Sequence, residues 1–172
     1  SYRTYGEFAD DYKPNIPVLK DHFCPYFTSW DQKIRDTTRV GQWKTDFDSL
    51  VAINALPKLN TLRIINDHTE GLSKGRPTPF AHVADNDLAI GMFIEYLSKS
   101  AVWNESAVFI LEDDAQNGAD HVDAHRSTAY VAGGFVKRNF VDHTMYTTSG
   151  MLRTMAALPI QYASNPRLSS AI

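Results

Sequence analysis

The chain has 172 residues and a net charge of −3, with 43% hydrophobic and 22% charged residues. This globular composition excludes a disordered tail, a collagen-like rod and a coiled coil. The negative charge leaves no basic footprint, so we expect no nucleic-acid partner. No apolar run reaches the roughly 18 residues that a membrane span needs, so we expect no membrane span. The single cysteine, Cys24, excludes an internal disulfide.

Residues 1–35 combine many aromatic side chains with prolines and show no clear helix or strand period. They predict a long extended segment that packs through its aromatic side chains over other parts of the molecule. Residues 37–55 predict a helix, because apolar side chains recur at near-helical spacing until Pro57. A short β-rich run over 62–65 follows and ends at Asn66-Asp67-His68.

The second half begins with a loop over 69–82, which is rich in glycine and proline. A helix is predicted from about 85 to 100, with Asp85 as its N-cap and an apolar stripe that includes Leu88 and Met92. The run Ala107–Leu111 is continuously apolar, as in a strand buried on both faces.

A further strand is predicted over 128–131, closed by Gly133-Gly134. A last helix begins near Thr148 and is expected to stop at Pro159. The tail over 161–172 is expected to be loosely held. Two buried strands linked by a helix indicate an α/β fold.

Both predicted strands end in possible metal ligands, Asp67-His68 and Asp113-Asp114. In α/β sheets, ligands bind at the carboxyl ends of strands. The segment after the second strand, Glu112–Arg126, also holds His121 and His125 among further carboxylates. Carboxylate and imidazole are the ligand set of zinc, manganese and iron sites. The spacing is not that of a closed zinc finger, so a structural zinc site is not expected.

Each of these features has a simpler alternative. The acidic segment can be a solvated loop with hydrogen-bonded histidines, and Asp67-His68 can serve as turn and cap residues. Lys74 and Arg76, in the loop after His68, can contact an anionic substrate or remain solvated. Asp87 is expected to stabilise the N-terminus of its helix. The residues alone do not decide between these alternatives.

Four motifs together resemble the bacterial phosphoesterase family of the alkaline phosphatase superfamily, which includes phospholipases C and acid phosphatases. The motifs are Asn66–Gly71, Pro77–Pro79, Ala84–Gly91 and Glu112–Arg126. The resemblance covers nearly the whole chain and is greatest to proteins that join a surface-layer-type β-propeller to a phosphoesterase domain. It implies a three-layer α/β/α sandwich with a mostly parallel central sheet, of which this chain is a partial domain over 1–172.

The resemblance also implies site residues. Asp113 matches the metal-binding acid after the strand, and Asp114 stands beside it. His121 and His125 match a downstream histidine region. His68 matches the histidine after the preceding strand, and Asp67 joins it. The superfamily often has an aspartate four residues before that histidine, where this chain has Ile64. Zinc is the expected metal, with manganese, iron or calcium as alternatives.

The superfamily's nucleophilic serine or threonine lies earlier in the domain, after a strand and an acidic residue. No such element is evident before residue 60. The chain is therefore expected to supply metal ligands to a phosphate-ester hydrolase, to lack the nucleophile and to be inactive alone. Its partners would be a phosphate-ester substrate, the N-terminal half of its domain and a β-propeller. The resemblance also implies an exported, periplasmic or cell-surface location.

Two other functions stay open. One is a non-catalytic binding or surface-layer module that keeps the fold. The other is a metallohydrolase that uses a metal-bound water and needs no nucleophile.

Overall fold

The computed structural model describes residues 1–113 and 126–164, with side chains described up to residue 158. The chain forms two compact units, Ser1–Glu95 and Tyr96–Ile172. Within the described ranges, no helix combines the length and the apolar character that crossing a membrane requires.

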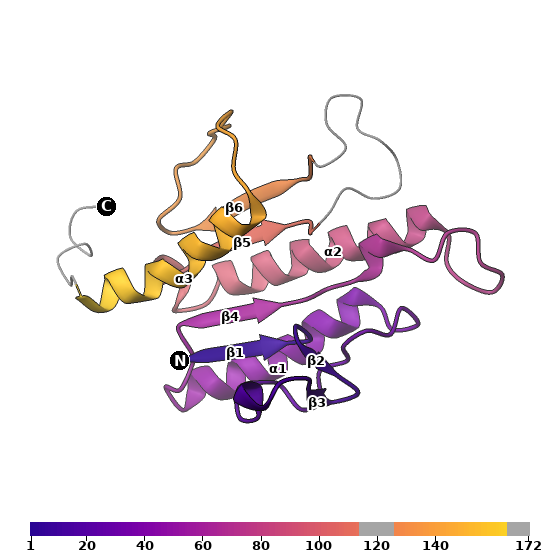
Figure 1. Cartoon of the computed structure of the whole chain (residues 1–172), viewed down its shortest axis with the longest axis horizontal. Helices are drawn as coiled ribbons and strands as arrows, with labels where there is room; N and C mark the ends of the chain where they lie inside the picture. The colour runs from indigo at the N-terminus through magenta and orange to yellow at the C-terminus, as the bar shows by residue number, and fades with distance from the viewer. Residues whose placement is uncertain (114–125, 165–172) are drawn as a thin grey trace. The chain divides into compact units, whose positions relative to one another are not determined.

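A parallel strand pair and a connecting helix form the centre of the first unit (Figure 1). Strand β1 (Tyr2–Tyr5) pairs in parallel with β4 (Leu59–Leu62), with Tyr2 opposite Leu59 and Tyr5 opposite Leu62. Helix α1 (Asp36–Ala52) connects them, which makes a β-α-β unit. The helix confirms the prediction over 37–55, whereas the strand over 62–65 was placed about three residues too late.

Five shorter or flanking elements complete the order of the first unit. They are β2 (Ala9–Asp10), β3 (Lys13–Pro14), the 3-10 turns η1 (Pro17–Leu19) and η2 (Asn66–His68), and α2 (Pro79–Ser98), which ends in the second unit. Strands β2 and β3 form a short antiparallel hairpin. Residues 1–35 are therefore more regular than their sequence predicts. The four residues of β1 are too few to show a strand period.

Aromatic side chains dominate the core of the first unit. The Tyr5 and Phe27 rings meet edge to face at 5.8 Å. On α1, Trp43 stacks on Phe47 at 4.9 Å and meets Phe93 of α2 at 4.5 Å. Such ring pairs add about 0.5–1.5 kcal/mol each beyond the burial of their area. The Tyr5–Phe27 pair lies within the N-terminal segment, and the Tyr5 hydroxyl joins that segment to α1 through a bond of 2.7 Å to Asp46.

Helix α2 begins six residues earlier than predicted and turns a polar face inward. Pro79 is its first residue, a position that proline favours. The Ala81 N–H donates a hydrogen bond of 3.3 Å to Thr78 Oγ1, so Thr78 caps the start of the helix. Asp85 therefore lies inside α2 and is not its N-cap. Asp87 likewise lies beyond the first turn.

The buried residues of α2 are His82, Asp85, Asn86, Ala89 and Leu97, whereas Leu88 and Met92 are 53% and 39% exposed. The prediction that Leu88 and Met92 belong to a buried apolar stripe was thus wrong. The reason is that buried polar side chains of α2 have partners on another helix, which hydrophobic periodicity does not detect.

The second unit contains an antiparallel strand pair. Strand β5 (Ala107–Leu111) pairs with β6 (Ala129–Gly133), with Ala107 opposite Gly133 and Leu111 opposite Ala129. Both strands confirm their predicted positions, but β5 is only partly buried. Gly133 has φ +142° and its Cβ position would overlap the Ser106 carbonyl, so only glycine fits there.

The remaining elements of this unit are the 3-10 turn η3 (Trp103–Glu105) and α3 (Thr148–Ser164). Helix α3 begins at Thr148 as predicted and continues past Pro159, where a stop was expected. The described part of the chain thus has one parallel and two antiparallel pairs of strands. A three-layer sandwich with a mostly parallel sheet stays a prediction.

Candidate functional site

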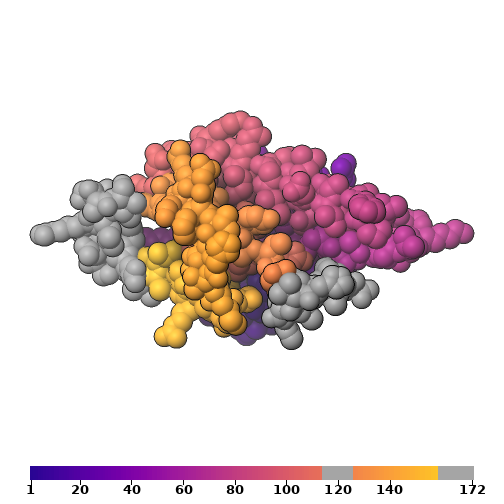
Figure 2. Space-filling view, turned by 90° about the horizontal axis from the view of Figure 1, so that it is seen from above, coloured from indigo at the N-terminus to yellow at the C-terminus, as the bar shows by residue number. Residues whose placement is uncertain are grey.

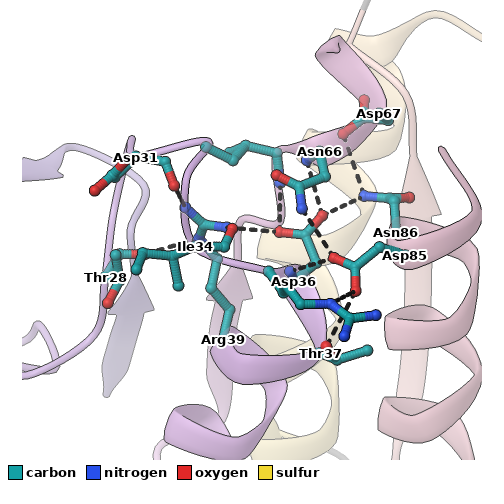
Figure 3. Close-up of polar contacts among 12 residues, drawn as sticks. Thr28, Asp31, Ile34, Asp36, Thr37, Arg39, Asn66, Asp67, Asp85 and Asn86 are labelled. Carbon is teal, nitrogen blue, oxygen red and sulfur yellow. Dashed lines mark hydrogen bonds and ion pairs between the residues drawn. The ribbon is translucent and has the colours of Figure 1, made fainter. Parts of the chain in front are cut away.

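A buried ion pair near the start of α1 is the centre of a polar network in the first unit (Figure 3). The side chains of Asp36 and Arg39 are both 0% exposed, and Arg39 Nη1 lies 3.0 Å from Asp36 Oδ1. Arg39 also donates to four backbone carbonyls, those of Thr28, Ser29, Asp31 and Ile34. Burial lowers the pKa of Arg39, and the nearby Asp36 carboxylate opposes that shift.

The Asp36 carboxylate joins α1 to the segment that follows β4. Besides Arg39, it accepts the backbone N–H of Ile65 at 3.1 Å and that of Asn66 at 2.8 Å. The Asn86 side chain of α2 donates a fourth bond at 3.0 Å. Because both oxygens are occupied by donors, Asp36 acts as a brace for the segment after β4 rather than as a ligand for a cation.

Asp85 of α2 caps α1 from outside. Its carboxylate accepts the backbone N–H of Asp36 at 2.6 Å and the Thr37 hydroxyl at 3.1 Å, both in the first turn of α1. It also accepts the Asn66 amide at 2.8 Å and Arg35 Nε at 3.0 Å. Burial alone raises the pKa of Asp85, but these four bonds outweigh burial and hold that pKa below its ordinary value.

Asn86 carries this bracing to the predicted site. Its side-chain amide donates to Asp36 at 3.0 Å and to Asp67 Oδ1 at 3.2 Å. Figure 3 shows Asn86 reaching from α2 toward Asp67, which lies in η2. Two helices therefore hold the short segment after β4, and one of the two predicted ligand residues in it is bonded directly.

The neighbouring residue, His68, is exposed and has a defined ring orientation. Its Nδ1 lies 3.1 Å from the Thr69 carbonyl oxygen, which only accepts hydrogen bonds, so the contact favours the tautomer with the proton on Nδ1. The Trp30 ring meets the imidazole edge to face at 5.2 Å. Gln32 donates to the same Thr69 carbonyl at 3.0 Å. In this tautomer the Nε2 lone pair is the one available to a ligand.

The arrangement fits part of a metal site. Metal-binding histidines usually donate their second ring N–H to a carbonyl or carboxylate, as His68 does to Thr69. Asp67 adds a carboxylate on the adjacent residue. Among residues 1–113 and 126–158, however, no group of three or more His, Cys, Asp or Glu side chains is placed to hold a metal. The first unit thus offers two ligand types, not a complete site.

The two predicted substrate-binding cations lie in the loop between η2 and α2, which projects from one end of the first unit (Figure 1 and Figure 2). Lys74 is exposed and makes no hydrogen bond or ion pair with a described residue. Arg76 instead bonds Glu70 Oε1 through Nη2 at 2.7 Å. Beyond Glu70 lies His82, which is 1% exposed, with its Nε2 3.7 Å from Glu70 Oε2. Arg76 therefore already has a carboxylate partner within the loop.

The remaining predicted ligands follow β5 in the second unit. Asp113 is exposed, two residues after the end of β5. Asp114, His121 and His125 lie outside the described residues. The structure therefore brings Asp67 and His68 together at one strand end, while Asp113 is placed at another strand end in its own unit.

Sequence reasoning missed the residues that brace the site. Asp36, Arg39 and Asn86 were not singled out, and Asp85 was given a local capping role. One signal was available. The run Ala84–Gly91 contains three consecutive side chains of the Asx type inside a helix. These side chains are unfavourable in a helix interior unless they have a partner elsewhere.

No protein-family model matches the chain, and no match was found among curated proteins or solved structures. The resemblance to phosphoesterases therefore rests on sequence motifs alone and stays a prediction. The geometry around His68 is an independent observation, since it comes from contacts and not from motifs.

Proposed function

We propose that this chain is the metal-binding part of a phosphate-ester hydrolase. Asp67 and His68 would contribute ligands after β4. Asp113 would do so after β5, together with Asp114 and one or both of His121 and His125. The observation that carries the proposal is the state of His68. Its ring is exposed, fixed by Trp30, and bonded through Nδ1 to a carbonyl, as in histidines that bind metals through Nε2.

The bracing of the segment supports the same conclusion. A buried Asp–Arg pair is weak evidence of stabilisation by itself, because desolvation offsets much of the attraction. Here Asp36 uses two of its four bonds on backbone N–H groups of the segment that carries the candidate ligands. Rigid ligands favour metal binding because less conformational entropy is lost when the ion binds.

A divalent ion bound there would neutralise charge on phosphoryl oxygens, which is the main requirement of phosphoryl transfer. Asp67 would supply a hard anionic oxygen, and Asn86 would keep that carboxylate oriented through its bond to Oδ1. His68 would supply its Nε2 lone pair while the Thr69 carbonyl holds the Nδ1 proton. The nucleophile would come from another part of the protein, so the 172-residue chain binds phosphate but does not turn over esters.

Zinc titration by calorimetry tests the ligand assignment. We expect the chain to bind zinc and His68→Gln to weaken binding by roughly tenfold or more, as for the loss of one imidazole ligand. The matched control is His22→Gln, because His22 is also exposed and its Nδ1 lies 3.2 Å from the Tyr2 carbonyl. His22 also follows an aspartate, Asp21, so this variant controls for an Asp-His pair that lacks the Asn86 and Trp30 contacts of Asp67 and His68. Equal affinities for the two variants would contradict the assignment of His68.

Phosphate binding separates a hydrolase part from a binding module. The zinc-loaded chain should bind inorganic phosphate, and Asp113→Asn should abolish that binding. If zinc binds and phosphate does not, the non-catalytic module is the better account. If neither binds, the metal site itself is refuted.

A further inference from the structure

An open cavity of about 470 Å³ in the first unit is lined by Asp10, Asp11, Trp30 and Arg63. It borders the segment after β4, because the Trp30 ring that lines it also meets His68 edge to face at 5.2 Å. Trp30 is 46% exposed. The indole ring is partly exposed at the wall of the cavity and lies beside the candidate metal ligand His68. The cavity could therefore hold the part of a substrate that does not react.

The polar groups of the cavity include both acceptors and donors. The Arg63 guanidinium lies 4.8 Å from the centre of the Trp30 ring and 3.7 Å from Glu7 Oε2. Asp10 accepts one bond, from the Asn15 amide at 2.7 Å. The Asp11 carboxylate accepts no hydrogen bond from any residue of the described ranges. The lining thus includes the Arg63 guanidinium, the Asp10 carboxylate with one hydrogen-bond donor, and the Asp11 carboxylate with no donor among the described residues.

A strained turn places one of these carboxylates. Asp11 and Tyr12 connect β2 to β3, and both have positive φ, 47° and 59°. Two-residue hairpin turns of this kind favour asparagine and glycine, so tyrosine is unfavourable there. Tyr12 is 54% exposed, so burial of its ring does not compensate. The hairpin turn itself requires positive φ at both positions, and this turn places Asp11 at the cavity.

We propose that this cavity binds a neutral cyclic polyol, such as a pyranose ring. The C–H face of a sugar packs on an indole ring, and vicinal hydroxyls both donate to carboxylates and accept from a guanidinium. An anion would be repelled by Asp10 and Asp11. A cation would have to compete with Arg63, which already lies 4.8 Å from the centre of the Trp30 ring, and the sugar would pack on the side of the indole that Arg63 leaves open. The mixed lining therefore favours hydroxyls over either charge.

Its place beside His68 makes the cavity the subsite for the alcohol part of the phosphate ester. That role rests on the proposed function, whereas polyol binding itself does not. The substrate class is then a phosphate ester of a sugar or a related cyclic alcohol, with the phosphoryl group at the segment after β4 and the ring against Trp30.

The test is an NMR titration of the 172-residue chain with methyl β-D-glucopyranoside and with methyl β-D-galactopyranoside, in the absence of metal. The indole N–H signal of Trp30 reports the cavity, and the signals of Trp43 and Trp103 serve as internal controls. We expect at least one glycoside to shift the Trp30 signal saturably below about 50 mM, since small neutral ligands bind weakly. The other two indole signals should not move.

Variants give the assignment its specificity. Asp11→Asn should weaken binding by roughly tenfold or more, as for a lost hydrogen bond to a charged group. Asp21→Asn, at an exposed aspartate that does not line the cavity, should leave binding unchanged. A Trp30 signal that responds to choline chloride or to sodium phosphate but to neither glycoside would overturn the proposal, as would no response at all. Because no metal is present, such a failure leaves the zinc test of His68 independent.

Discussion

Replacing Asp36 by alanine tests whether the buried network braces the first unit. The carboxylate accepts four hydrogen bonds, from Arg39, Ile65, Asn66 and Asn86, at 2.8 to 3.1 Å. Alanine leaves the buried guanidinium without its counter-charge and leaves two backbone N–H groups without their acceptor. Both losses act on the folded state, since the unfolded chain solvates the same groups in water.

The expected loss in the free energy of unfolding is about 3–5 kcal/mol, the range for removing one partner of a buried ion pair. It should not be much larger, because Arg39 keeps its bonds to four backbone carbonyls. Against a typical domain stability of about 5–15 kcal/mol, a loss of this size is measurable and leaves room for folding. Asp36→Asn keeps the side-chain volume and serves if the alanine variant does not fold.

Urea unfolding followed by tryptophan fluorescence measures this loss. The control is Asp48→Ala in the same helix, where Asp48 and Lys44 are 43% and 46% exposed and lie 3.2 Å apart. An exposed pair of this kind contributes about 0.3–0.5 kcal/mol. A loss below about 1 kcal/mol for Asp36→Ala, or equal losses for the two variants, would refute the bracing role.

Three further predictions concern single buried groups. The hydrogen bonds of Asp85 outweigh its burial and lower the pKa of its carboxyl in the folded state. The ionised carboxylate therefore stabilises the fold above pH about 4, and that contribution is lost as the pH falls through the lower folded pKa. Between about pH 5 and pH 3, the urea midpoint of Asp85→Asn should fall less than that of the unsubstituted chain, and an unchanged pH profile would contradict this. Burial raises the pKa of the Cys24 thiol, which is 3% exposed. The native chain should therefore react with Ellman's reagent far more slowly than the urea-unfolded chain, and equal rates would be inconsistent with that burial. Both ring nitrogens of His82 lack a hydrogen-bond partner among the described residues. His82→Leu should therefore raise the free energy of unfolding by about 1 kcal/mol. A lower free energy of unfolding would mean that the contact with Glu70 outweighs the cost of the two unpaired nitrogens.

The parts of the fold that could be predicted from the sequence are those with a local signal. Helix α1 and strand β5 were located to within a few residues, because an apolar period and a continuous apolar run are both local patterns. Strand β1 was missed because its partner, β4, lies more than fifty residues away and neither strand exceeds four residues. The inward polar face of α2 was missed for the same reason.

The candidate site divides in the same way. That Asp67 and His68 follow a strand could be predicted, since they are adjacent in the sequence. Their support could not, because Asn86 and Asp36 reach this segment from 19 and 30 residues away. A hydrogen bond that fixes one tautomer of a histidine depends on backbone geometry, which no composition or spacing reports.

The most direct test of the central claim is the protonation state of the His68 ring. Long-range proton–nitrogen NMR spectra of the labelled chain distinguish its two ring nitrogens above pH about 7.5, where an ordinary histidine is neutral. We predict that Nδ1 carries the proton in the free chain and that adding zinc shifts the Nε2 signal more than the Nδ1 signal. A proton on Nε2, or a His68 spectrum that zinc does not change, would contradict a metal ligand at this position.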